Sequence, residues 1–343
     1  MSNKIFVSIA AFEDKALTKT MQRLLDSADN PENISFGLAL NYKTYPDLSN
    51  FKNDIRIVYD RDFDFPGIVR MRDEIRKLIR DEEYFLGLDA HTVPAVSWDT
   101  NLIRDIKELT SNGEKIIISS QINMPWSDFS CRTEWRMGGS WHNGWGLDGV
   151  GVEEEKDIFA KNIKMINEKY FFNYYISCNF MFMLTSHIPL ANFPSYHGFP
   201  WEEVEQSITC FCNGFDIVAP LIEYSYIRKD VDERYVPPFD PDFWIELPAD
   251  EWNPLPHHRR KWIMDSDEMQ FEVEKLLIVG KNEYYSLEGL ERSLLDFYKT
   301  IGLEDQYFNI LCDAYTNDLK AETNRTDRLY APYDVDKLRR DDV

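Results

Sequence analysis

The stretch EEYFLGLDAHTVPAVSWD, residues 82–99, decides how this chain folds and where its chemistry lies. Its apolar run YFLGL is typical of a buried strand. The run ends on an acid, a spacer and a histidine, which are Asp89, Ala90 and His91. A protein core rarely holds such polar side chains, and ligands bind at the carboxyl ends of parallel strands, so these residues predict a functional edge of a sheet.

The segments around this stretch alternate between strand and helix patterns. Apolar and β-branched runs predict further strands, at residues 4–11, 34–41, 54–60, 115–122 and 174–184. Apolar residues at helical spacing predict helices, at residues 16–28, 65–82, 98–112, 201–211, 268–277 and 287–298. The alternation over the first 125 residues predicts an α/β nucleotide-binding fold.

Composition restricts the class of protein. The chain has 343 residues, of which 43% are hydrophobic, and this suits a packed globular core. A formal net charge of -22 disfavours binding to nucleic acid or to anionic membranes. No apolar run reaches the roughly 18 residues of a membrane span, and the N-terminus shows no signal peptide. We therefore expect a cytoplasmic protein.

The five cysteines are odd in number and lie mostly in apolar stretches, which suits free thiols in a reducing compartment. Cys210 and Cys212 form a C-x-C pair that could belong to a metal site. Such a pair without a second pair or a neighbouring histidine is more often part of the core.

The Asp89-x-His91 pattern has the chemistry of a metal site. Residues i and i+2 of an extended segment point to the same side, so both side chains can reach one ion. A carboxylate and an imidazole suit a borderline divalent cation such as Mn2+. Such an ion could bind the phosphates of a nucleotide-sugar and take up charge as the diphosphate leaves. The alternative is a capped strand end with a surface histidine.

Four segments, at residues 5–40, 70–103, 199–220 and 284–303, occur together in the order of one known family. They resemble the polypeptide α-N-acetylglucosaminyltransferases that act on hydroxyproline in the cytoplasm. The resemblance implies a GT-A fold of the α/β class, with a Rossmann-like half, a mixed central sheet and a C-terminal extension of helices and loops. It also implies a UDP-sugar donor, Mn2+ or Mg2+, and retention at the anomeric carbon.

The resemblance assigns roles to individual residues. DAH matches the family's D-S-H metal motif, which gives Asp89 and His91 as ligands. The arginine of the family's A-R motif falls on Arg72, which would assist the donor phosphates. A solvent-facing arginine on an amphipathic helix is the alternative for this position.

Two further motifs extend the site. The family's S-I-A stretch, which lines the uridine pocket, falls on Ser8, Ile9 and Ala10. Its acidic pair in F-x-G-E-E falls on Glu202 and Glu203, and one of these carboxylates would orient a sugar hydroxyl or the acceptor. Acidic residues at a helix start also complement the helix dipole, so a structural role is the alternative.

The sequence departs from the family pattern at three positions. Glu13 stands in place of an arginine, Trp201 in place of a glycine, and Tyr224 in place of a histidine that would supply a further metal ligand. His258, or its neighbour His257, could replace that ligand from a C-terminal loop. The diphosphate and waters could instead complete the coordination shell.

Changes in amino-acid composition and periodicity along the chain suggest three regions. We predict a nucleotide-sugar-binding half at residues 1–125, an acceptor-side half of the same domain at 126–236, and a Pro-rich connection with C-terminal helices at 237–343. A long loop in the second region is rich in Gly and Ser and carries four tryptophans, Trp126, Trp135, Trp141 and Trp145. These could form a stacking floor for a sugar acceptor or belong to the core.

Together these patterns predict a metal-dependent, retaining glycosyltransferase whose acceptor is a hydroxyl of a protein or a glycan. One alternative keeps the chemistry but transfers the sugar to a hydroxylated nucleobase of viral DNA, against which the net charge argues. Another is a non-catalytic protein that binds a nucleotide-sugar or a glycan.

Overall fold

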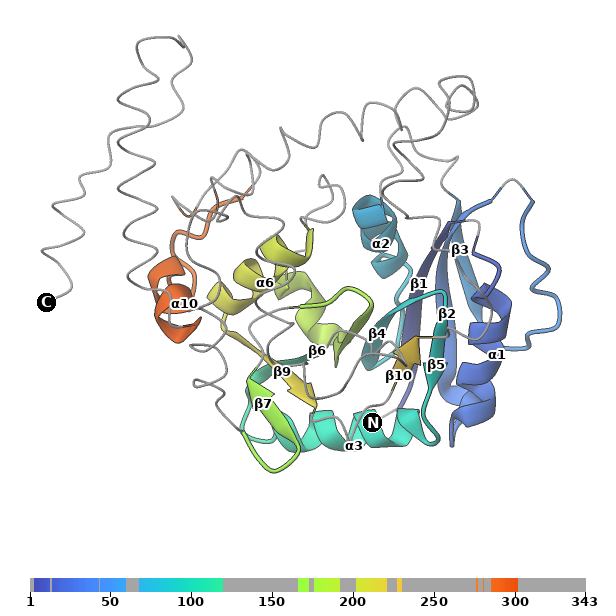
Figure 1. Cartoon of the computed structure of the whole chain (residues 1–343), viewed down its shortest axis with the longest axis horizontal. Coiled ribbons are helices and arrows are strands. Elements are labelled where there is room, and N and C mark those ends of the chain that lie inside the picture. The colour runs from blue at the N-terminus through green and yellow to red at the C-terminus, as the bar shows by residue number, and fades with distance from the viewer. Residues whose placement is uncertain are drawn as a thin grey trace, which may run out of the picture.

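The computed structural model of the chain is shown in Figure 1. It describes residues 3–12, 14–42, 44–59, 68–119, 166–172, 176–191, 202–220, 227–229, 276, 280 and 285–301. Three predicted features lie outside these residues: the tryptophan-rich loop, the Pro-rich connection at 237–256, and all but one residue of the helix at 268–277.

Eight strands form one mixed sheet in the order β3-β2-β1-β4-β8-β6-β9-β7. Their bounds are β1 Ile5–Phe12, β2 Ile34–Asn41, β3 Ile55–Tyr59, β4 Tyr84–Asp89, β6 Lys115–Ser119, β7 Tyr170–Phe172, β8 Phe180–Leu184 and β9 Phe215–Pro220. Strands β1 to β4 are mutually parallel, as the alternation predicted. Antiparallel β8 lies between β4 and β6. Strands from both predicted halves therefore share one sheet.

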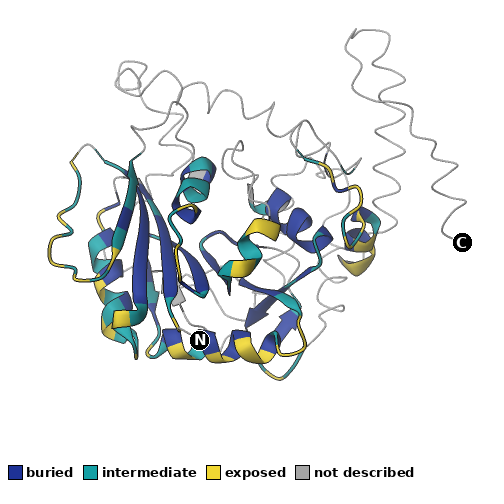
Figure 2. Ribbon diagram, turned by 180° about the vertical axis from the view of Figure 1, so that it is seen from behind, coloured by how far each residue is buried: buried dark blue, intermediate teal, exposed yellow. Residues whose placement is uncertain are grey.

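Helices cover both faces of this sheet (Figures 1 and 2). Helices α1 (Leu17–Ser27) and α3 (Trp98–Leu109) pack on one face, where residues such as Met21 and Ile106 are fully buried. Helices α2 (Ile68–Arg76) and α6 (Glu202–Cys212) cover the other face. The buried positions of α1 follow the 3.6-residue period of its sequence, which is why the pattern located this helix.

Helix α2 lies close to β1 because small residues line the sheet beneath it. Ser8 on β1 is in register with Gly37 on β2 and Gly87 on β4. A Cβ atom at Gly37 would lie 2.1 Å from the ring of Phe6 and 2.6 Å from Ile75 of α2. Only glycine fits at position 37, and the close packing holds α2 over the carboxyl ends of the strands.

Two predicted helices have different bounds in the structure. Helix α2 ends at Arg76, six residues before the predicted end, and Leu78 and Ile79 form turns that lead into β4. The C-terminal helix α10 (Leu294–Ile301) begins after Ser293. The hydroxyl of Ser293 accepts the Asp296 amide at 3.0 Å, and the Asp296 carboxylate accepts the Ser293 amide at 2.8 Å. This reciprocal cap begins the helix seven residues later than the periodicity predicted.

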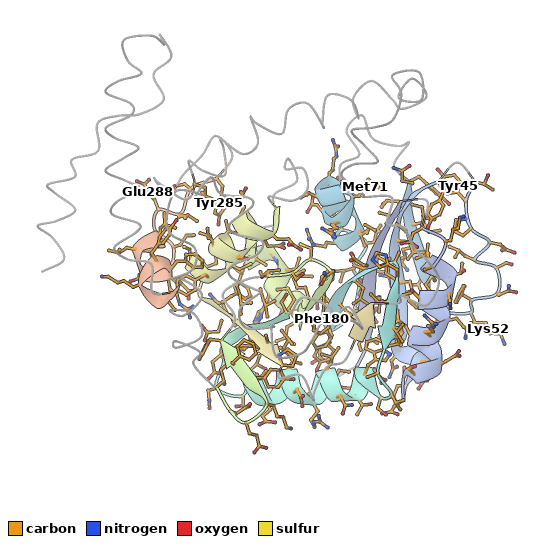
Figure 3. All side chains as sticks on the ribbon, viewed as in Figure 1. Tyr45, Lys52, Met71, Phe180, Tyr285 and Glu288 are labelled. Atoms are coloured by element: carbon orange, nitrogen blue, oxygen red, sulfur yellow. The ribbon has the colours of Figure 1, made fainter. Side chains whose placement is uncertain are left out.

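Residues 285–301 pack against α6 and β9. Arg292 contacts Asp216 of β9 at 2.8 Å and stacks its guanidinium over the ring of Phe211. Figure 3 labels Tyr285 and Glu288 at this end of the molecule, with Phe180 inside the sheet and Met71 on α2. The C-terminal segment is thus part of the same folded body as the sheet.

The described cysteines confirm the prediction of buried free thiols. Cys178, Cys210 and Cys212 are free and buried, and burial raises the pKa of the Cys212 thiol to about 12. The C-x-C pair is therefore part of the core. Among the described residues, no helix is both long and apolar enough to cross a membrane.

Candidate functional site

The carboxyl ends of β1 and β4 meet at the centre of the sheet. Along the sheet, the chain passes from β1 to its neighbour β2 on one side and from β4 to β6 on the other side, so the strand order reverses between β1 and β4. In α/β proteins, ligands bind at the carboxyl ends of the strands beside such a switch point. Ala10 of β1 is in register with Asp89, the last residue of β4.

Asp89 and His91 converge at this edge. The imidazole Nε2 of His91 lies 3.7 Å from the carboxylate Oδ2 of Asp89, and both side chains are about one-fifth exposed. Ala90 between them is buried in the core, so the backbone alternates its side chains as the sequence predicted. The D-x-H pattern is a convergent pair of polar groups at a partly open edge.

The spacing of these two ligand atoms is close to that of two ligands on one divalent ion. At metal–ligand bonds of about 2.1 Å, two ligands of an octahedral ion lie about 3 Å apart when adjacent and about 4 Å apart when opposite. The separation of 3.7 Å lies between these two values, so a shift of less than about 1 Å in the side chains would bring both atoms to one ion. The described residues contain no group of three or more His, Cys, Asp or Glu side chains arranged for a metal. The rest of a coordination shell would come from elsewhere.

Arg72 reaches this pair from α2. Its guanidinium lies 3.7 Å from Oδ1 of Asp89, and its side chain is only 14% exposed. Met71 and Ile75 bury the neighbouring face of α2 against the sheet and so aim Arg72 at the strand ends. Arg72 is therefore not a solvent-facing arginine, which was the alternative for this position.

Asp14 is a residue of the site that the sequence analysis did not single out. It follows β1, is 5% exposed, and its Oδ2 lies 2.9 Å from Nδ1 of His91. The available signal was its place directly after a parallel strand, at the same edge as Asp89. Nothing in the local sequence indicates its partner, which lies 77 residues away.

The three residues of the predicted uridine pocket differ in their setting. Ile9 is fully buried in the core on the face of α1 and α3, so its side chain does not reach the site. Ser8 is 5% exposed, and Ala10 is partly exposed next to Asp89. Only Ala10 borders the open edge with its side chain.

Glu203 is tied to the end of β8 nearest this edge. Its Oε1 accepts the backbone N–H of Cys178 at 2.8 Å. Phe180, two residues later, is paired with Leu88 of β4, so this turn adjoins the end of β4. Part of the hydrogen bonding of Glu203 is therefore structural. Glu202 begins α6, and its side chain lies outside the described part of the chain.

Several predicted residues also lie outside the described residues: Glu13, Trp201, Tyr224, His257, His258 and the four loop tryptophans. The strand β10 (Ile227–Lys229) follows Tyr224 closely and pairs antiparallel with β5 (Thr92–Pro94). Lys229 is in register with Thr92, the residue after His91. This two-stranded ribbon brings Ile227–Lys229 beside the segment that follows Asp89 and His91 (Figure 1).

Comparison with protein families identifies the chain. The model of the family described as "Glycosyltransferase (GlcNAc)" matches residues 4–59 and 67–307, which is most of the sequence. The chain belongs to this glycosyltransferase family. The prediction of a glycosyltransferase is therefore confirmed at the level of the family. A comparison with curated protein sequences finds no match.

Solved structures with a similar fold are also glycosyltransferases. GalNAc-T7, in a structure with UDP, GalNAc and Mn2+, matches with a TM-score of 0.51 at 12% identity, over 92% of this chain and 57% of that chain. S. aureus TarS gives a TM-score of 0.46 at 12% identity, over 96% and 56%. The chain thus spans little more than half of the GalNAc-T7 chain and of the TarS chain. The similarity to GalNAc-T7 confirms the predicted α/β fold of GT-A type.

Proposed function

We propose that this glycosyltransferase transfers a sugar from a UDP-sugar to a hydroxyl of a protein or glycan, with Mn2+ or Mg2+ and with retention at the anomeric carbon. The observation that carries the proposal is the convergence of Asp89 and His91, 3.7 Å apart, at the switch point of the sheet. The GalNAc-T7 structure, which holds UDP, GalNAc and Mn2+, supports the choice of donor and metal.

In this mechanism Asp89 and His91 hold the ion, which would neutralise charge on the diphosphate as it departs. Arg72 lies beside Asp89 and donates hydrogen bonds to donor phosphate oxygens through its planar guanidinium. Ala10 borders the nucleoside with its side chain, the buried Ser8 and Ile9 support this strand end, and His258 is a candidate third ligand.

The transfer itself needs no dedicated base. The bond between the anomeric carbon and the diphosphate oxygen breaks, and the acceptor oxygen forms a new bond on the same face of the sugar. The acceptor's proton passes to the departing phosphate oxygen. Glu203, held by the Cys178 amide, and its neighbour Glu202 orient the sugar or the acceptor hydroxyl.

The resemblance to cytoplasmic hydroxyproline-modifying transferases supports a hydroxyproline side chain as the first acceptor to test, and a cytoplasmic site of action. The division into regions at residues 125 and 236 belongs to the same proposal, with the donor bound mainly by the first region.

A screen of UDP- and GDP-sugars with Mn2+ or EDTA tests the donor and the metal. We expect wild-type protein to turn over one UDP-sugar with Mn2+, and Asp89→Ala and His91→Ala to lose that turnover. Asp26→Ala, which removes an exposed carboxylate on α1, is the matched control and should keep it. Normal turnover by folded Asp89→Ala and His91→Ala proteins would refute the site.

The product and the acceptor are tested separately. Proton NMR of the first product should show an α-linkage from an α-linked donor, and a β-linkage would exclude retention. Hydroxyproline peptides, glycans and hydroxymethylated DNA should be compared as acceptors at two salt concentrations. Strongly salt-dependent transfer to DNA would favour the nucleobase alternative.

A further inference from the structure

Asp14 is a buried carboxylate in the connection between β1 and α1. It lies at the carboxyl edge of the sheet, and only 5% of it is exposed. Buried carboxylates require hydrogen-bond donors around them, because desolvation of the charge is costly. The donors that surround Asp14 therefore indicate what the residue does.

Two backbone contacts fix this residue in place. Its Oδ1 accepts the backbone N–H of Ala16 at 2.8 Å, at the start of α1. Its own carbonyl oxygen accepts the hydroxyl of Tyr42 at 2.7 Å, from the segment that follows β2. The Ala16 amide thus holds one oxygen of the carboxylate, and the Tyr42 hydroxyl holds the backbone of the same residue.

The second oxygen, Oδ2, lies 2.9 Å from Nδ1 of His91. An ionised carboxylate only accepts hydrogen bonds, so Nδ1 must carry the hydrogen. In the neutral imidazole the other nitrogen, Nε2, is then the one without a hydrogen and carries the lone pair. Nε2 is the atom 3.7 Å from Oδ2 of Asp89, on the side where the two ligands converge.

We propose that Asp14 is a positioning residue of the metal site, which holds His91 in the tautomer whose Nε2 lone pair faces Asp89. Metal-binding histidines commonly donate their second ring N–H to a carboxylate, which fixes the orientation and basicity of the ring. The proposal rests on the metal dependence proposed above. A purely structural role at the start of α1 is the competing explanation.

The geometry makes Asp14→Asn an informative change. The Ala16 amide can only donate, so it selects the oxygen of the new carboxamide. The NH2 group then faces His91, and Nδ1 must become the acceptor. The hydrogen moves to Nε2, which is the tautomer that cannot bind a metal through Nε2.

The first test uses the wild-type, metal-free protein. Long-range 15N–1H NMR correlations of the His91 ring distinguish the two neutral tautomers, and His91→Gln assigns the signals. We expect hydrogen on Nδ1. Hydrogen on Nε2 in the wild type would overturn the proposal without any Asp14 variant.

The second test measures Mn2+ binding by electron paramagnetic resonance, without donor or turnover. Asp14→Asn should move the hydrogen to Nε2 and weaken Mn2+ binding by about 10- to 100-fold. Asp105→Asn is the matched control, because Asp105 is equally buried and accepts the Tyr170 hydroxyl at 2.7 Å. The control should keep wild-type affinity and tautomer. Wild-type affinity and tautomer in folded Asp14→Asn would also overturn the proposal.

A rescue variant separates positioning from helix capping. Adding Ala16→Pro removes the amide that selects the carboxamide oxygen, and the φ of -85° at Ala16 is close to that of proline. The carboxamide oxygen can then face His91, so the double variant should regain hydrogen on Nδ1 and most of the affinity. A folded double variant that keeps the single variant's tautomer would contradict the proposed role.

The two proposals can fail separately. Absence of both Mn2+ and Mg2+ binding in the wild type, with hydrogen on Nδ1, would refute the metal dependence and leave the Asp14–His91 assignment standing. Tight Mn2+ binding with hydrogen on Nε2 would refute only the role of Asp14.

Discussion

Glu82 precedes β4 and Asp89 is its last residue, so two carboxylates lie at opposite ends of one buried strand. The side chain of Glu82 is 2% exposed and accepts hydrogen bonds from Arg56, from Ser35 at 2.6 Å and from the Arg80 amide at 2.8 Å. Burial alone would raise the pKa of Glu82, but these bonds outweigh it and lower the pKa to about 2.

Asp89 has a looser and more open setting. Its side chain is 21% exposed, and the nearest nitrogens of Arg72 and His91 are each 3.7 Å from its carboxylate, beyond hydrogen-bond length. Short bonds at Glu82 stabilise the fold, whereas the spacing at Asp89 suits a ligand between the groups. The two ends show that contact length and exposure, more than residue type, separate a structural acid from a candidate ligand.

Replacing Asp89 by Asn should give the largest effect. We expect the turnover of donor to fall by about 10³-fold, equivalent to about 4 kcal/mol, because the ion loses a charged ligand. The urea midpoint should stay near that of wild type. Retained turnover in Asp89→Asn would show that the carboxylate at the end of β4 is not a functional ligand.

Replacing Glu82 by Gln should show the opposite pattern. The change removes the buried one of the two charged partners of Arg56 and should lower the free energy of unfolding by about 3 kcal/mol. The Michaelis constant for donor should be unchanged in the folded protein. Urea denaturation and donor kinetics, measured on the same sample, check both expectations.

Acidification should affect stability through Glu82. Its pKa is lower in the folded than in the unfolded chain, so its contribution is complete above about pH 4.5 and is lost as the pH falls towards 2. The shift corresponds to a loss on the order of 3 kcal/mol. Subtracting the Glu82→Gln profile of stability against pH from that of wild type isolates this contribution. Parallel profiles would show that the pKa of Glu82 is not lowered in the folded protein.

Replacing Arg72 by Lys should have a moderate effect on donor binding at the Asp89 end of β4. Lysine keeps the charge but lacks the planar fork that binds phosphate oxygens in pairs. We expect the Michaelis constant for donor to rise about tenfold, with unfolding free energy within about 0.5 kcal/mol of wild type. An equal loss of stability would instead indicate that Arg72 is mainly structural.

Replacing Asp54 by Asn should give the smallest effect. Asp54 also contacts Arg56, at 2.7 Å, but it is 49% exposed, and exposed ion pairs contribute little. We expect a loss of about 0.5 kcal/mol in chemical denaturation. A loss as large as that of Glu82→Gln would show that the burial of Glu82 and Asp54 does not determine how much each of them stabilises the fold through Arg56.

Much of the fold could be predicted from local patterns. A continuous apolar run located β2 with its observed bounds, because both faces of this strand are buried. The 3.6-residue pattern located α1 within one residue at each end, because one face of this helix is buried. The position of β8 between β4 and β6 could not be predicted, since strand order depends on which faces pack together over the whole chain. The end of α2 was misplaced because apolar residues that turn into β4 continue the helical spacing.

The sequence by itself determined the pairing of Asp89 with His91, because two residues of one extended segment are brought to the same side by backbone geometry alone. The tertiary structure decided what surrounds them. Arg72 reaches Asp89 because small residues on the sheet admit α2, and Asp14 reaches His91 because the parallel neighbours β1 and β4 end at the same edge of the sheet. Contacts between residues far apart in sequence depend on strand register and helix packing, which no local pattern encodes.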